Sequence, residues 1–163
     1  LVGYHYAKHF TWLTHWILGF TDGIAAAGGW VAVRGSLDPL ALLLWFVVIV
    51  WMAGFDLIYA CQDVDFDRAH GLRSIPARVG VPASLRLSRA MHVGAVACML
   101  SLAWATPLSA FYYAGVVGVA LLLAYEQSLV RADDLSQVKR AFDLNGFVGI
   151  YYLAVLAVSV YAW

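Results

Sequence analysis

Charged residues are scarce in this chain of 163 residues, which has only 10 basic and 10 acidic side chains. They make up 12% of the chain, whereas a soluble domain usually has ~25%. Hydrophobic residues make up 63%, and the mean hydropathy is +0.78. With a formal net charge of zero, no basic excess exists to neutralise nucleic-acid phosphates. The composition therefore indicates an integral membrane protein and argues against a nucleic-acid partner.

A disulfide framework and a signal peptide are also missing. The two cysteines, Cys61 and Cys98, match no repeated metal-binding spacing, and we interpret both as ordinary small apolar residues. The sequence starts at Leu1 without a Met or a basic leading segment. We therefore expect it to begin within a longer protein.

Long apolar segments dominate what is present. Each approaches the ~17–25 residues needed to cross the hydrocarbon of a bilayer. The predicted spans are Trp12 to Val33, Leu40 to Ala60, Ala90 to Ala105, Leu108 to Tyr125, and Phe147 to Trp163. They show no alternation of polar and apolar residues, which favours helices over barrel strands. The predicted fold is all-α, a polytopic transmembrane bundle of about five helices.

Basic residues are distributed asymmetrically about these spans. Only Arg34 falls in a loop on one side. The other nine are Lys8, Arg68, Arg73, Arg78, Arg86, Arg89, Arg131, Lys139 and Arg140. The positive-inside rule makes their side cytoplasmic. We therefore expect a bacterial inner-membrane protein whose acidic motif, described next, faces the cytoplasm.

Four carboxylates directly follow the sixteen uncharged residues from Leu40 to Phe55. On an α-helix, which advances about 100° per residue, Asp56, Tyr59, Asp63 and Asp67 share one side, and Asp65 points nearly opposite. Acids so close repel one another unless a cation holds them. Oxygen ligands suit Mg²⁺, which recruits phosphate oxygens as further ligands. We predict that Asp56, Asp63 and Asp67 bind Mg²⁺ and that Tyr59 lies in the same site.

The loop from Arg68 to Arg89 follows the acids. Its glycines and prolines predict short pieces rather than one continuous helix. The loop either caps a cavity below the acids or is a solvated connector whose arginines only enforce topology. In a cap, the guanidinium groups of Arg73 and Arg78 would suit a phosphate oxygen pair.

A metal and diphosphate site at a membrane surface suggests a lipid diphosphate as the ligand. Mg²⁺ and cationic side chains neutralise charge that develops on a leaving diphosphate. A prenyl diphosphate fits, with its tail lying along the spans. Ionisation would leave an allylic carbocation, which aromatic faces such as Tyr59 or Phe55 can stabilise where water is excluded.

Other polar residues carry weaker signals. Asp22 lies within the first span, where an ionisable group is functional by default, or it hydrogen-bonds within the bundle. Glu126, at the end of the fourth span, is expected to be solvated. The histidines show no ligand spacing, and we predict no role for them.

The run from Asp56 to Gly80, DLIYACQDVDFDRAHGLRSIPARVG, closely resembles the second aspartate-rich motif of the UbiA superfamily of intramembrane prenyltransferases. The segment from Tyr6 to Thr11 resembles the basic segment before that family's fifth helix. The segment from Asp133 to Gly146 resembles its final cytoplasmic loop. Together these resemblances extend over essentially the whole chain.

This resemblance implies nine transmembrane helices around a central cavity, with two aspartate-rich motifs that bind Mg²⁺ and prenyl diphosphate. Asp56, Asp63 and Asp67 would be the acids of the second motif, with Tyr59 in the same site. Arg73 and Lys8 would contact the diphosphate. No stretch of the first-motif type occurs in the sequence. We therefore expect residues 1–163 to be the last five helices of one such domain, inactive alone.

The predicted function is Mg²⁺-dependent transfer of a polyprenyl group from its diphosphate to an aromatic acceptor in ubiquinone or menaquinone biosynthesis. The sequence leaves open a 4-hydroxybenzoate-like or a naphthoate-like acceptor. The alternative is a fragment of a cation-coupled transporter that uses Asp22 and the acidic cluster. A transporter predicts acids near the midplane, whereas these acids lie at one span's end beside arginines.

Overall fold

The computed structural model describes residues 4–106 and 108–161, and five of its helices are long and apolar enough to cross a membrane. These are α2 (Thr14–Arg34), α3 (Pro39–Ala60), α6 (Val81–Ala105), α7 (Ala110–Leu129) and α8 (Val138–Tyr161). No strand occurs among the described residues, where one isolated bridge joins Arg131 and Asp134. The predicted all-α membrane bundle is confirmed. Residues 1–3, 107, 162 and 163, which include the predicted end of the last span, lie outside this description.

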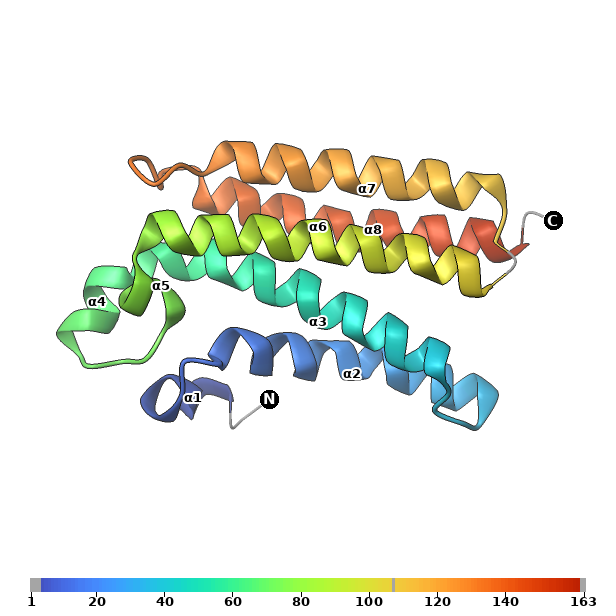
Figure 1. The fold of residues 1–163 in the computed structure, drawn as a ribbon, viewed down its shortest axis with the longest axis horizontal. Helices are drawn as coiled ribbons and strands as arrows, with labels where there is room; N and C mark the ends of the chain where they lie inside the picture. Colours follow the sequence, from blue (N-terminus) through green and yellow to red (C-terminus); the bar gives the residue numbers. More distant parts are fainter. Residues whose placement is uncertain (1–3, 107, 162–163) are drawn as a thin grey trace.

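Short elements gather at one end of the bundle, as Figure 1 shows. They are α1 (Tyr4–Phe10), the 3₁₀ turn η1 (Cys61–Asp63), α4 (Val64–Ala69) and α5 (Ile75–Val79). The starts of α6 and α8 lie at the same end, and the turn between α2 and α3 lies at the other (Figure 1). The segments that carry nine of the ten basic residues therefore share one end. Which end faces the cytoplasm remains a prediction.

Two spans begin earlier than the sequence predicted. Helix α6 starts at Val81 rather than Ala90, and α8 starts at Val138 rather than Phe147. A hydrophobicity pattern stops at charged residues, but a helix can continue through its polar first turns beyond the hydrocarbon. The predicted breaks at Gly71 and Gly80 are confirmed by positive φ angles of 66° and 83°. The expectation of short pieces throughout the loop is wrong beyond Gly80, because α6 is continuous from there.

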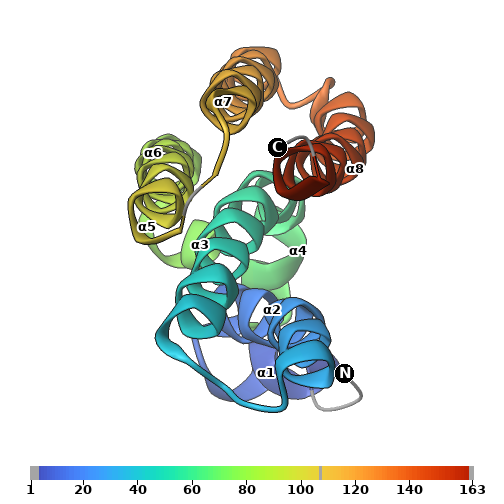
Figure 2. The same cartoon turned by 90° about the vertical axis from the view of Figure 1, so that its right-hand side faces the viewer.

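Helix α3 occupies the centre of the bundle. Viewed along the long axis in Figure 2, α6, α7 and α8 lie on one side of it and α1 and α2 on the other. The main core joins α3 to α6, α7 and α8 through buried residues such as Trp51, Met99, Val116 and Val148. On the other side, Gly19 and Gly23 let α2 approach closely, because a Cβ would lie 2.4 Å from atoms of Ile49 or Trp45. Because α3 packs on both sides, the end that carries the acids has a fixed position.

Buried polar contacts also tie α6 and α7 to this frame. The Ser88 hydroxyl donates to the Gly54 carbonyl at 2.6 Å, and the Gln127 amide donates to Ser88 Oγ at 2.7 Å.

Glu126 is also buried, with 0% of its surface exposed, and neither of its carboxylate oxygens has a hydrogen-bond partner among the described residues. The expectation that Glu126 is solvated is therefore wrong. It follows Val119 and Leu123 at helical spacing on the packed face of α7.

Candidate active site

The acidic stretch is not one continuous α-helix, contrary to the geometry that the sequence analysis assumed. Helix α3 ends at Ala60, η1 covers Cys61–Asp63, and α4 resumes at Val64. A 3₁₀ turn has 3.0 residues per turn and rotates the chain by about 120° per residue. The acids beyond it therefore do not stay on the line set by Asp56. Asp56 and Asp67 are buried, Asp63 is partly exposed, and Asp65 is exposed as predicted.

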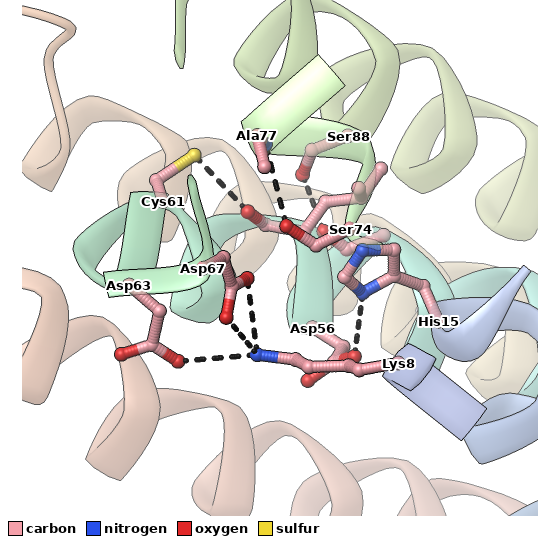
Figure 3. Close-up of polar contacts among 11 residues, drawn as sticks. Lys8, His15, Asp56, Cys61, Asp63, Asp67, Ser74, Ala77 and Ser88 are labelled. Carbon is pink, nitrogen blue, oxygen red and sulfur yellow. Dashed lines mark hydrogen bonds and ion pairs between the residues drawn. The ribbon is translucent and has the colours of Figure 1, made fainter. Parts of the chain in front are cut away.

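Lys8 joins two of the predicted acids. Its ammonium Nζ lies 3.2 Å from both carboxylate oxygens of Asp67 and 3.5 Å from Oδ2 of Asp63, as Figure 3 shows. The Asp67 side chain is 1% exposed and the Lys8 side chain 27% exposed. A pair so shielded from water interacts more strongly than a surface ion pair. The structure thus brings Lys8, Asp63 and Asp67 together, and their predicted roles in binding Mg²⁺ and diphosphate stay predictions.

The two loop arginines hold α1 in place over the acids. The backbone N–H of Arg73 donates to the Lys8 carbonyl at 2.6 Å, and its guanidinium donates to the Phe10 carbonyl at 2.7 Å. The Arg78 guanidinium lies over the Trp12 ring at 5.0 Å, in cation–π geometry. Both residues therefore position the segment that carries Lys8. Their predicted contact with a diphosphate remains untested.

Asp56 has a partner that the sequence analysis missed. His15 Nδ1, at the start of α2, lies 2.6 Å from Asp56 Oδ2, and both residues are buried (Figure 3). Because an ionised carboxylate only accepts hydrogen bonds, the imidazole N–H is the donor. No spacing in the sequence reveals this pair, which spans 41 residues. The sequence did contain one signal for a partner of Asp56, because a carboxylate at the end of a membrane span needs a polar group nearby.

Tyr59, which is 40% exposed, packs against an aromatic ring of α8. The Phe142 ring of α8 lies 5.4 Å from the Tyr59 ring and 5.5 Å from the Phe55 ring, centroid to centroid. Phe142 lies in the segment that resembles the final loop of the UbiA superfamily, but we predicted no role for it. Beside these rings is a cavity of about 400 Å³. Its lining residues are Tyr59, Gln62, Lys139, Phe142 and Asp143.

Asp63 and Asp67 are arranged to hold a cation, because oxygens of both carboxylates surround the single ammonium of Lys8. Within residues 4–106 and 108–161, no cluster of three or more His, Cys, Asp or Glu side chains could hold a metal ion. A magnesium ion needs only one or two carboxylates when substrate phosphates and waters complete its shell. Two carboxylates are therefore enough for Mg²⁺ bound together with a diphosphate, and the assignment of Asp63 and Asp67 as its ligands stays a prediction.

Asp22, the residue invoked for a transporter, lies on α2 and is near enough to Asp56 for the two carboxylates to interact electrostatically. Its side chain is partly exposed, and none of the hydrogen bonds among the described residues involves it. The alternative role for Asp22, a hydrogen bond within the bundle, is therefore not observed there. The acids that do converge, Asp63 and Asp67, lie at the end of the bundle with α1 and α5 rather than midway along it.

Comparisons with known proteins agree on one family. Residues 1–161 match the UbiA prenyltransferase family. The chain is 30% identical over 156 residues to a 4-hydroxybenzoate octaprenyltransferase from Cronobacter sakazakii, covering 96% of this chain and 53% of the relative. It is also 30% identical over 160 residues to a mitochondrial 4-hydroxybenzoate polyprenyltransferase from Caenorhabditis elegans, covering 98% of this chain and 45% of that protein.

A solved structure also matches, the apo form of a UbiA homolog from Aeropyrum pernix K1. The TM-score is 0.84 at 36% identity, and the match covers 98% of this chain and 60% of that one. The chain spans about half the length of the curated relatives described above. The family match and the fold match each cover nearly the whole chain, and the chain belongs to the UbiA prenyltransferase family.

Proposed function

We propose that this chain is the carboxyl-terminal part of a Mg²⁺-dependent prenyltransferase that moves a polyprenyl group from its diphosphate to an aromatic acceptor. The observation that carries the proposal is the convergence of Lys8, Asp63 and Asp67 at one end of a membrane bundle. In this arrangement the carboxylates would face the metal ion, the Lys8 ammonium would face the diphosphate, and the apolar helices would contact the prenyl tail. The transporter alternative has less support, because the chain belongs to the UbiA prenyltransferase family.

The donor would bind with its diphosphate at the acids and its tail along the spans. Asp63 and Asp67, together with Asp56, would hold Mg²⁺, which when bound neutralises charge on the diphosphate oxygens. Lys8 is placed to stay with the acids or to turn its ammonium toward the diphosphate. Arg73 and Arg78 would keep α1 closed over the site through their contacts with Phe10 and Trp12.

The reaction would proceed by ionisation followed by electrophilic substitution. The bond between the allylic carbon and the diphosphate oxygen breaks, and its electron pair leaves with the diphosphate. The allylic carbocation is then attacked by a carbon of the acceptor ring, which forms the new carbon–carbon bond and loses a proton. The rings of Phe55, Tyr59 and Phe142 would shield the cation from water and stabilise its charge.

The acceptor we favour is 4-hydroxybenzoate, which the names of the relatives specify for those proteins. A naphthoate-like acceptor of a menaquinone route is the second candidate. We further propose that a first acidic motif completes the site from a segment outside this sequence, and that the site faces the cytoplasm. The basic residues gathered at the end that carries the site support this orientation.

The test uses membranes that contain the protein at its natural length, incubated with radiolabelled polyprenyl diphosphate, Mg²⁺ and a panel of aromatic acids. We expect a labelled, prenylated product with one acceptor of the panel, and its loss when EDTA removes Mg²⁺. The panel identifies the acceptor, and donors of different lengths identify the preferred chain. Absence of product with every acceptor, together with cation-dependent solute flux, would replace the proposal with the transporter alternative.

A further inference from the structure

A groove between α6 and α7 lies apart from the residues of the candidate active site. Figure 2 shows these two helices on the side of α3 opposite α1 and α2. The groove holds a cavity of about 420 Å³, and the residues of α6 and α7 that line it take no part in the site around Asp67. This volume is within the ~300–1,000 Å³ typical of small-molecule sites. The groove is therefore a separate candidate for ligand binding.

The lining of this cavity changes from polar to apolar along the two helices. Arg89 and Gln127 lie toward the end of the bundle where α6 starts and α7 ends, which is the end that carries the acids. About two turns deeper into the span, Val96 and Ala120 line the same cavity. Val93 lies between these levels and is 71% exposed, so the apolar part of the groove opens to the outside of the bundle. Such a lining suits an amphiphile with its polar group at the membrane surface and its hydrocarbon chain toward the membrane centre.

Small side chains on α7 leave the apolar part of the groove open. Ala120 and Ala124 both line the cavity from this helix, one turn apart. At the polar end the two helices do meet, because the Gln127 amide donates to Ser88 Oγ at 2.7 Å and lies 3.0 Å from His92 Nδ1. A hydrocarbon chain in the groove would supply the packing contacts that the two alanines do not reach.

Two arginines give the polar end of the groove a positive charge. Arg89 lines the cavity, Arg86 lies one turn before it on α6, and both are exposed. Among residues 4–106 and 108–161, neither guanidinium takes part in an ion pair or a hydrogen bond. The one carboxylate on these two helices is that of Glu126, which is buried. The charge of the rim therefore suits an anion, and a guanidinium matches a phosphate oxygen pair.

We propose that the groove between α6 and α7 binds an anionic phospholipid of the bilayer, with its phosphate at Arg86 and Arg89 and an acyl chain along Val93, Val96 and Ala120. Basic residues between membrane helices, close to the membrane surface, are a recurrent way to hold anionic lipid headgroups. A prenyl diphosphate suits this groove less well, because no exposed carboxylate of α6 or α7 is there to hold a metal ion with it. The bound lipid joins α6 to α7 and adds to the stability of the fold.

The first experiment measures lipid binding by native mass spectrometry of the natural-length protein, delipidated in detergent and titrated with phosphatidylglycerol or with zwitterionic phosphatidylcholine. We expect Arg89→Gln to weaken phosphatidylglycerol binding roughly five-fold and to leave phosphatidylcholine binding unchanged, because one basic residue at an anionic surface contributes about that factor. Arg131→Gln is the matched control, with the same loss of charge at the same end of the bundle from a guanidinium that Asp133 already holds. Equal phosphatidylglycerol affinity in Arg89→Gln and Arg131→Gln would overturn the proposal. Arg89 and Arg131 are exposed, so neither substitution disturbs the core.

A second experiment locates the acyl chain. The natural-length protein is reconstituted in phosphatidylcholine vesicles that contain a phosphatidylglycerol with a photoreactive diazirine on its acyl chain, and cross-linked peptides are identified after illumination. We expect cross-links at Val93, Val96 and Ala120, and their loss in Ala120→Leu, whose larger side chain fills the groove. Cross-links that avoid both helices would overturn the proposal and show that the groove is covered, by a segment outside this sequence or by a second copy. Neither experiment depends on prenyl transfer, so the lipid site and the proposed function are tested separately.

Discussion

At the scale of single residues, the acids that look equivalent in the sequence differ in their burial and in their partners. Asp67 is almost fully buried against Lys8, Asp63 is partly exposed beside the same ammonium, and Asp56 pairs with His15. Asp65, two residues from both Asp63 and Asp67, points away into solvent. Four aspartates within twelve residues thus have distinct surroundings, which substitutions can distinguish.

Asp67→Asn should abolish most prenyl transfer, whereas Asp65→Asn should retain it. The first substitution removes a charge placed to hold the metal and diphosphate, and loss of one such group costs on the order of 10²-fold or more in rate. The second alters only an exposed side chain. Transfer of radiolabel in membranes, normalised to protein level, measures both. Full activity in Asp67→Asn would remove the site assignment.

His15→Ala should lower stability by about 1–3 kcal/mol, because it removes the hydrogen bond between His15 and the buried Asp56 carboxylate. His15→Gln should recover part of the loss, since a side-chain amide can also donate a hydrogen bond. Thermal unfolding of the detergent-purified protein provides the comparison. If His15→Ala melts at the wild-type temperature, the contact contributes nothing to folding.

At the scale of elements, α1 is a seven-residue helix too short to be stable alone. Its position comes from the loop that follows α4, through the two hydrogen bonds of Arg73 and the cation–π contact of Arg78. This arrangement favours the cap role of the loop over that of a solvated connector. Lys8 therefore reaches the acids only when the loop is folded.

Arg73→Ala should loosen α1. We expect faster amide hydrogen exchange in residues 4–10 and a raised KM for the prenyl diphosphate, because Lys8 moves away from Asp67. Arg131→Ala is the control, since that guanidinium hydrogen-bonds an exposed neighbour, Asp133. If transfer falls while exchange in α1 stays unchanged, Arg73 acts directly on the diphosphate, as the resemblance implied.

The start of α3 depends on a charged N-cap. Hydrogen bonds from the Ala41 N–H, the Trp30 indole and the Leu40 N–H lower the pKa of Asp38 from its usual value. A lowered pKa in the folded state gives stability that is present above the unfolded-state pKa of ~3.9 and is lost as pH falls through the folded-state value. The free energy of unfolding, measured at a series of chosen pH values from about 6 down to about 2, should therefore depend less on pH in Asp38→Ala than in the wild type. Parallel curves for the variant and the wild type would contradict this.

At the scale of the whole molecule, the five spans place the Asp63 and Asp67 cluster and the 130–137 loop at the same end. We predict that this end is cytoplasmic. Single cysteines at Ser36 and Ser136, in a chain with Cys61 and Cys98 replaced by alanine, should react from opposite sides of the membrane. An impermeant thiol reagent added outside intact cells should label Ser36→Cys and spare Ser136→Cys. The reverse pattern would invert the topology.

Much of the fold follows from local sequence. The apolar runs predicted five spans, and the glycines predicted the breaks at Gly71 and Gly80. Span boundaries were less predictable, because a hydrophobic pattern marks where hydrocarbon ends rather than where a helix ends. Glu126 was assigned to solvent for the same reason, since its proximity to a span end says nothing about which face of α7 is packed.

The sequence by itself determined the membrane class, the family resemblance and the identity of the acids, because these depend on composition and on residues close together in the chain. Only the tertiary structure decided which residues meet. It paired His15 with Asp56, and it placed the Lys8 ammonium between the carboxylates of Asp63 and Asp67. It also formed the cavity that Tyr59 and Lys139 both line. Each joins residues separated by 41 to 80 positions. Such contacts depend on how helices pack, which no local pattern encodes.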